Sequence, residues 1–291
     1  MRGCCGSGIG RFELHDAPPQ VIKVGDGFDA LSPDGRAPML GDALRDGKVA
    51  LAFLTRLPVR QDRPWQNADL AASVTMFPVV GLLVGLLGAL AYAAAIALAL
   101  PPLPAAVLAL AALVWSTGAM HEDGLADLAD GLGGATRAQR LEIMRDPRVG
   151  SFGVIALVLA LLARAGALAA LAAPAEVAAA LIAAATWSRA LLPPALLALP
   201  RARIDGLAAQ AGRPHPARVA AAAAIAILVA LVLLPPLVAA IALMLAALAG
   251  VMPALLAFRR LGGITGDVLG AIQQIAEIAF LLTLVAMASA R

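Results

Sequence analysis

Long stretches without a charged residue constrain this chain more than any other feature of its sequence. Residues 74–120 contain no Asp, Glu, Lys or Arg, and the proline-rich segment 101–104 interrupts this run near its middle. A transmembrane helix needs about 20 consecutive apolar residues, so the run predicts two spans joined by a tight turn. With 61% hydrophobic and 14% charged residues, the chain has more apolar surface than one soluble core can bury. We therefore predict an integral membrane protein.

Five more spans follow from the same pattern. They are the apolar segments 150–173, 176–199, 219–234, 237–258 and 268–290. The first two contain one arginine each, and Pro235-Pro236 separates the third from the fourth. The apolar content is mostly Ala, Leu and Val, which is typical of closely packed helices and not of a barrel with aromatic girdles. The sequence predicts an all-α, polytopic protein of about seven transmembrane helices.

The distribution of basic residues predicts the orientation of these spans. Segments 101–104, 173–175 and 235–236 lack Lys and Arg, whereas the other connections carry arginines: Arg137, Arg140, Arg145, Arg148, Arg201, Arg203, Arg213, Arg218, Arg259 and Arg260. By the positive-inside rule the basic loops and the N-terminus lie in the cytoplasm and the C-terminus lies outside. The net charge of +3 is thus explained by orientation in lipid, without a nucleic-acid partner. We expect a multi-pass protein of the cell (inner) membrane.

The N-terminal region differs from the rest of the chain. Residues 1–41 are polar, rich in Gly, Pro and Asp, and lack the apolar run of a signal peptide. We predict a disordered tail there, followed by a membrane-embedded catalytic domain over residues 42–291. An apolar stripe over residues 42–57 fits a short helix along the membrane surface or, equally, a helix packed on the bundle. The adjacent Cys4 and Cys5 indicate neither a disulfide framework nor a zinc site.

Segment 121–131 is the most informative for chemistry. Asp123, Asp127 and Asp130 are spaced i, i+4 and i+7, so they share one face of a helix. Crowded carboxylates repel one another unless a divalent cation lies among them, and oxygen ligands favour Mg²⁺, Mn²⁺ or Ca²⁺ over zinc. The alternative is a solvated acidic face. His121 precedes this face and is a candidate general base, although metal activation alone would also suffice.

Other groups extend this candidate site. Glycines 131, 133 and 134 allow close backbone approach, and Arg145 and Arg148 flank an acid with guanidinium groups suited to phosphate. The predicted topology places Asp267 on the same side of the membrane as Asp123, as a second half-site. Ionisable residues at membrane depth are costly, so Arg164, Arg189 and Glu277 are expected to contact an anionic substrate or one another.

These residues resemble those of the cobalamin synthase family, the adenosylcobinamide-GDP ribazoletransferases, over about residues 51–282. The most specific block is His121 to Gly131, with its pattern of His, any residue, Asp-Gly-Leu-Ala-Asp and a final Asp-Gly. Other blocks occur in the family's order: Phe53 to Val59, Phe77 to Gly81, Glu142 to Asp146 with Arg148 and Gly150, Ser188-Arg189, Pro200 with Arg201 to Gly206, and Thr265 to Asp267 with Glu277. The tail before Ala43 and the Gln273-Gln274 pair depart from the family's pattern.

The resemblance implies a reaction and its cofactor. The phosphocobinamide group of adenosylcobinamide-GDP is transferred to the ribose 3′-hydroxyl of α-ribazole, or of its 5′-phosphate, and GMP is released with the help of Mg²⁺. The expected roles are metal ligation by Asp123, Asp127, Asp130, Asp146 and Asp267, catalysis by the first three with His121, and phosphate binding by Arg56, Arg145, Arg148 and Arg189.

Two other functions fit parts of the pattern. A CDP-alcohol phosphotransferase also places aspartates at helix ends on a cytoplasmic face, but its Asp-Gly motif continues with Ala-Arg and a later pair of aspartates that this chain lacks. A secondary transporter would explain the intramembrane charges, but the two halves show no matched interrupted helices. The sequence leaves the oligomeric state open, a homo-oligomer included.

Overall fold

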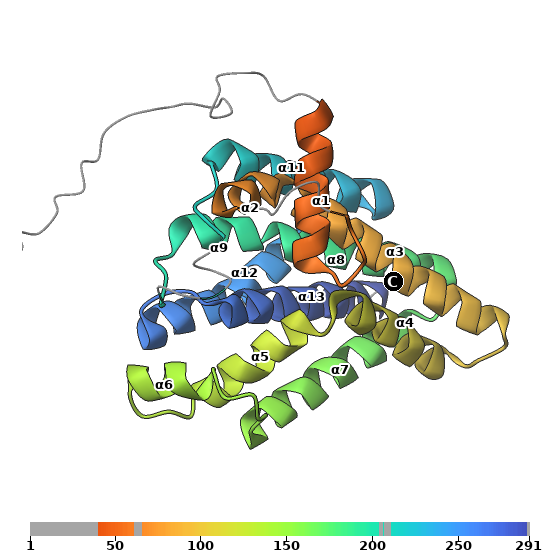
Figure 1. The fold of residues 1–291 in the computed structure, drawn as a ribbon. Coiled ribbons are helices and arrows are strands. Elements are labelled where there is room, and N and C mark those ends of the chain that lie inside the picture. The colour runs from red at the N-terminus through yellow and green to blue at the C-terminus, as the bar shows by residue number, and fades with distance from the viewer. Residues whose placement is uncertain (1–39, 61–65, 204–205, 207–210, 290–291) are drawn as a thin grey trace, which may run out of the picture.

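The computed structural model describes residues 40–60, 66–203, 206 and 211–289, and every regular element in these ranges is a helix. The predicted tail, residues 1–41, lies almost wholly outside them. The helices, shown in Figure 1, are α1 (Leu40–Leu54), α2 (Asn67–Ser73), the short 3₁₀ helix η1 (Val74–Met76), α3 (Phe77–Ala97), α4 (Pro102–Thr117), α5 (Met120–Gly131), α6 (Arg137–Ile143), α7 (Ser151–Leu171), α8 (Pro174–Ala190), α9 (Leu192–Ala198), α11 (Pro216–Leu233), α12 (Pro236–Leu261) and α13 (Gly266–Ser289). The predicted all-α class is confirmed.

The predicted turns between spans are also confirmed. Helices α4, α8 and α12 begin at Pro102, Pro174 and Pro236, where a missing backbone N–H costs no hydrogen bond. Within the described residues, six segments are long and apolar enough to cross a membrane, and the bent pair of α4 and α5 would make a seventh. The predicted count of about seven spans therefore agrees with the fold.

Small residues let the longest helices approach closely. A Cβ atom added at Gly85 of α3 would lie 2.7 Å from the Cα of Ile182 on α8, and Gly81 makes an even closer approach to the α8 backbone. Contacts of this kind hold transmembrane helices together, because apolar side chains gain little by leaving lipid for a protein interior. The Ala-rich composition thus serves helix packing.

The connection between α4 and α5 is a sharp bend, which the sequence does not predict. Gly118 and Ala119 both adopt left-handed backbone conformations, with φ of 65° and 60°, and the two helices meet at 89°. Only glycine adopts such a φ without strain, and the Arg56 side chain also packs directly against Gly118. The bend turns the acidic helix α5 across the direction of α4.

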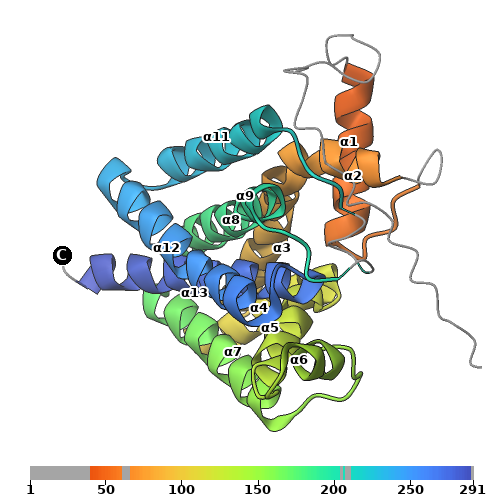
Figure 2. The same cartoon turned by 90° about the vertical axis from the view of Figure 1, so that its left-hand side faces the viewer.

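Helix α1 lies across one end of the bundle, as Figure 2 shows. It packs on α2, η1 and α3, and buries Val49, Ala50 and Leu54. Its direction fits the predicted helix along a membrane surface, and its contacts fit the alternative of a helix packed on the bundle. The two interpretations are compatible, because a helix that lies along the membrane surface can still pack one of its faces on the bundle.

Three connections that carry arginines meet at one end of the molecule. The backbone of Ala202 donates to the carbonyl of Ile264 at 2.9 Å, which joins the segment after α9 to the segment before α13. Arg137 of α6 donates to the carbonyl of Ala202 at 3.1 Å, and Arg203 donates to that of Leu141 at 2.8 Å. The basic loops that the sequence assigns to one side of the membrane therefore lie together.

Candidate active site

Helix α5 presents two different faces. Asp123 is exposed and Asp127 and Asp130 are partly buried on one face, whereas His121 and Glu122 are buried against the bundle. The structure thus places the three aspartates on one helix, as their spacing predicts.

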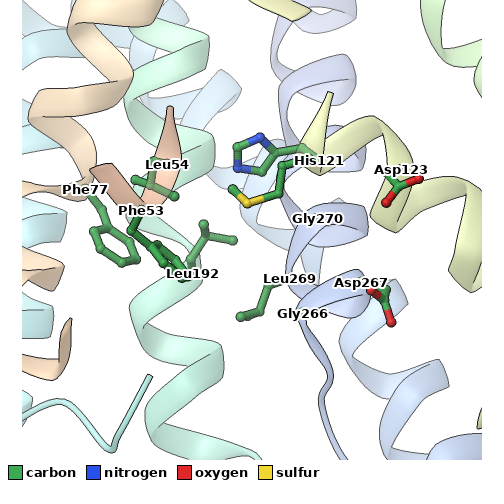
Figure 3. Close-up of a pocket in the computed structure, with 11 residues that line it drawn as sticks. Phe53, Leu54, Phe77, His121, Asp123, Leu192, Gly266, Asp267, Leu269 and Gly270 are labelled. Carbon is green, nitrogen blue, oxygen red and sulfur yellow. The ribbon is translucent and has the colours of Figure 1, made fainter. Parts of the chain in front are cut away.

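Asp267 joins this group because α13 approaches α5 at a pair of glycines. A Cβ added at Gly124 would lie 2.7 Å from the carbonyl oxygen of Asp267, and one added at Gly270 would lie 3.0 Å from that of His121. Asp123 and Asp267 consequently line the same pocket, together with His121 (Figure 3). Two carboxylates separated by 144 positions in the sequence are brought together in this way.

The cluster of carboxylates has few cationic neighbours. Asp127 experiences the negative charges of Asp123, Asp267 and Asp130, against the positive charge of Arg203. The Arg203 guanidinium lies 4.0 Å from Asp267 Oδ2, and the Thr265 hydroxyl donates to the same oxygen at 3.1 Å. The result is an excess of negative charge beside the pocket that Asp123 and Asp267 line.

The donor chemistry of this cluster fits a hard divalent cation. No three His, Cys, Asp or Glu residues in the described ranges are already arranged to hold a metal ion by themselves. Mg²⁺ in phosphoryl-transfer sites is commonly bound by one or two carboxylates together with water and substrate phosphates. An open set formed by Asp123, Asp127 and Asp267 is consistent with such a metal site, which the substrate would complete.

Asp130 has a different environment. Its two carboxylate oxygens accept hydrogen bonds from the backbone N–H groups of Gly150, at 2.7 Å, and Gly153, at 2.8 Å. These groups belong to the first turn of α7, which has no capping side chain of its own. Asp130 therefore ties the end of α5 to the beginning of α7.

Replacing Asp130 with Ala is expected to lower the free energy of unfolding by about 1 kcal/mol, the usual cost of losing a helix cap. Thermal unfolding in detergent measures this effect. Asp123→Ala is the matched control and should not lower the melting temperature, because Asp123 is exposed among like charges. Equal melting temperatures for Asp130→Ala and the wild type would show that the cap contributes nothing.

The loop between α6 and α7 holds the predicted phosphate ligands away from the pocket lining. Arg148 forms a bidentate pair with Asp146, at 2.9 and 2.6 Å, and these hydrogen bonds lower the pKa of the Asp146 carboxyl to about 2. Arg145 is exposed on the same loop. Asp146 is thus engaged with an arginine and not with the aspartates of α5. Arg56 is exposed beside the α4–α5 bend.

Arg189 lies in a buried ionic network and not on an accessible surface. Arg164 of α7 pairs with Glu122 at 2.9 Å and with Glu277 of α13 at 3.1 Å, while Arg189 of α8 lies 3.6 Å from Glu277. Gln273 and Gln274 donate hydrogen bonds to Glu277 and Glu122, at 2.6 and 3.1 Å. The sequence predicts that these intramembrane charges contact either an anionic substrate or one another. The structure shows that they contact one another.

Sequence reasoning did not assign a role to Glu122, Arg203, Gln273 or Gln274. Glu122 is adjacent to the exposed Asp123 and not four residues from it, so it lies on a different face of the helix and points into the bundle. An acidic residue on the apolar face of an amphipathic helix was the signal that could have predicted its burial. Arg203 was one of several loop arginines with nothing to distinguish it. Gln274, which departs from the family's pattern, nevertheless belongs to the buried network.

Together, the fold and the site define a multi-span helical membrane protein with a carboxylate cluster beside a pocket, at the end of the bundle where its basic loops meet. Comparison with known proteins then identifies the family. The model of the cobalamin-5-phosphate synthase family matches residues 47–285, so this chain belongs to that family.

Curated relatives agree with this membership. The adenosylcobinamide-GDP ribazoletransferase of Bradyrhizobium diazoefficiens is 47% identical over 86% of this chain and 96% of its own length. Those of Mesorhizobium japonicum and Ralstonia nicotianae are 44% and 42% identical, over 82% and 86% of this chain and 92% and 98% of their own lengths. No solved structure matches the chain.

Proposed function

We infer that this chain is an adenosylcobinamide-GDP ribazoletransferase, which acts in assembly of the nucleotide loop of cobalamin. The observation that carries this inference is the family match over residues 47–285, which contains the acidic helix, Asp267 and the buried network. The alignment with this chain covers more than nine-tenths of the length of the relatives that are named for this activity. In the reaction, the ribose 3′-oxygen of α-ribazole or its 5′-phosphate attacks the phosphocobinamide phosphorus, and the bond to the GMP oxygen breaks.

The chemistry of the site agrees with such a transfer. The substrate pyrophosphate is anionic, so it would be repelled by an uncompensated carboxylate cluster. Asp123, Asp127 and Asp267 are the residues that would hold Mg²⁺, and the bound ion would supply positive charge to offset that of the pyrophosphate and of the leaving GMP. Arg203, beside Asp267, is positioned to add a second positive charge.

The proton of the attacking hydroxyl needs an acceptor near the same place. His121 is only 2% exposed, whereas Asp123, which lines the same pocket, is exposed. We assign the proton to a carboxylate of the cluster and not to His121. Asp130 becomes a positioning residue in this proposal, because its oxygens are engaged by α7, whereas Asp146 pairs with Arg148 on the loop and takes no part in the transfer.

We place this site on the cytoplasmic side of the membrane. The arginines of the connections around α6, after α9 and before α13 gather at the end of the bundle that contains the cluster. Figure 1 shows α6 at the left of the molecule and the C-terminal end of α13 on the right. This arrangement supports the positive-inside orientation, with cytoplasmic loops around the active site.

The proposed function is tested by GMP release from adenosylcobinamide-GDP and α-ribazole 5′-phosphate, using protein purified in detergent. We expect release that requires Mg²⁺ and stops when EDTA is added in excess of the metal. Turnover in micelles also excludes transport as the only function, since transport requires two compartments. Absence of GMP release from well-folded protein, with release of CMP from a CDP-alcohol instead, would favour the other phosphotransferase class.

A further inference from the structure

We propose that the apolar end of the pocket beside Asp123 and Asp267 binds the aromatic base of the acceptor nucleoside, with His121 as its hydrogen-bond partner. This proposal rests on the function inferred above and names the part of the substrate that the pocket receives. The cavity has a volume of about 90 Å³, several times the roughly 10–15 Å³ that holds one water molecule. It lies where α1, α3, α5, α9 and α13 meet.

The two ends of the pocket differ in chemistry. Figure 3 shows Asp123 and Asp267 at one end, and Phe53, Phe77 and Leu192 at the other. Between them lie Leu269 and two glycines of α13. A ligand that fits this arrangement has an apolar part on one side and a group that meets carboxylates, or their metal, on the other.

Two aromatic rings line the apolar end of the pocket. The rings of Phe53 and Phe77 are stacked, with centroids 5.9 Å apart and planes inclined by 18°. Phe53 comes from the end of α1 and Phe77 from the beginning of α3, so two separate elements contribute these rings. Parallel or offset stacking favours a flat aromatic ligand over an aliphatic chain.

His121 adds one polar group to this lining. Its side chain extends from α5 towards the apolar side of the pocket (Figure 3), and its buried Nε2 has no hydrogen-bond partner among the described residues. A buried polar atom without a partner costs free energy, so such atoms commonly mark the place of a ligand or water. In the tautomer protonated at Nε2, His121 donates to an aromatic nitrogen that carries a lone pair.

The base of α-ribazole matches these features. It is a dimethylated benzimidazole, which is flat and apolar and has a single unsubstituted ring nitrogen that accepts a hydrogen bond. With the base against Phe53 and Phe77, the attached ribose points towards Asp123 and Asp267, where its 3′-hydroxyl must react. The guanine of the donor has several donors and acceptors that this lining leaves unpaired, and the corrin ring of the donor is much larger than the cavity.

A lipid chain is the other apolar occupant to consider. It would leave His121 Nε2 unpaired and would place hydrocarbon beside two carboxylates, both of which are unfavourable. The aromatic base satisfies the histidine, and its ribose satisfies the polar end. The structure therefore favours the nucleoside.

The test measures binding and turnover separately in detergent-purified full-length protein. Equilibrium dialysis gives the Kd of α-ribazole, and GMP release gives kcat and KM for both substrates. Leu269→Trp fills the cavity, and Leu159→Trp is the matched control on a lipid-exposed position of α7. His121→Leu removes the hydrogen bond, whereas His121→Gln retains a donor.

We expect Leu269→Trp and His121→Leu each to raise the Kd and KM of α-ribazole by about tenfold or more, the factor that one hydrogen bond or a misfitted apolar group contributes. The KM of adenosylcobinamide-GDP should stay within about twofold in these variants and in Leu159→Trp, because the donor does not occupy this pocket. His121→Gln should recover part of the affinity.

Two results would overturn the proposal. One is an unchanged Kd for α-ribazole in Leu269→Trp and His121→Leu. The other is a large loss of kcat at unchanged KM in both His121 variants, which would make His121 the general base. If wild-type protein binds α-ribazole in dialysis and both variants weaken that binding, but no GMP is released, the inferred reaction fails while the base-binding pocket stands.

Discussion

Asp123→Asn and Asp267→Asn are each expected to lower kcat for GMP release by about 10²–10³-fold, the usual loss when one preorganised electrostatic contact to the transition state is removed. Both substitutions keep the shape of the side chain and remove its charge. They should also raise the Mg²⁺ concentration needed for half-maximal activity, because a neutral amide is a weaker ligand for a hard cation. Initial rates over a titration of Mg²⁺ measure both effects.

Asp146→Asn is the matched control for this experiment. Asp146 is also an aspartate predicted from the sequence to bind metal, but it pairs with Arg148 on an exposed loop. We expect its kcat and its Mg²⁺ requirement to stay within about threefold of wild type, since exposed ion pairs contribute little. Equal losses for Asp146→Asn and Asp123→Asn would mean that the loop moves onto the cluster during the reaction. Full activity of Asp123→Asn and Asp267→Asn would refute the metal site.

The sequence predicted most helices well, because the bilayer imposes a length and proline marks the turns. The breaks before Pro102 and Pro236 occur where charge-free runs exceed the length of one span, and Pro174 divides an apolar segment of about twice that length. The bend between α4 and α5 was missed. Gly118 gave a weak signal, but Ala119 also takes a left-handed conformation, which no local propensity favours.

The candidate site was predicted in part, because local spacing is visible in the sequence whereas contacts between helices are not. Helical periodicity placed Asp123, Asp127 and Asp130 on one face, and the alternation of loops placed Asp267 on the same side. Periodicity does not show which carboxylate meets a neighbouring backbone, so the role of Asp130 as a cap for α7 needed the fold. Likewise, the burial of Arg189 depends on how α8 packs against α13, and Arg203 lies near Asp267 only because of the segment before α13.

Arg164→Met is expected to destabilise the protein by about 3–5 kcal/mol, the cost of leaving a buried acid without its partner. Arg164 is 1% exposed and is the only arginine that contacts both Glu122 and Glu277 within the described part of the chain. The network contains two arginines and two glutamates, so removing one arginine leaves an excess negative charge where solvation is poor. Melting temperature in detergent and the yield of monodisperse protein measure the loss.

Restoring the charge balance separates this explanation from simple loss of packing. In the double variant Arg164→Met with Glu122→Gln, one cation and one anion are removed, and Arg189 remains beside Glu277. We expect this variant to recover more than half of the lost stability, since a neutral polar or apolar replacement of a buried ion pair is often tolerated. Glu122 precedes Asp123 on α5, so the same double variant also tests whether the network positions the carboxylate cluster. If it does, the variant regains stability but its kcat for GMP release stays low. If the double variant is as unstable as Arg164→Met alone, the stabilisation comes from the packing of the arginine side chain and not from its charge.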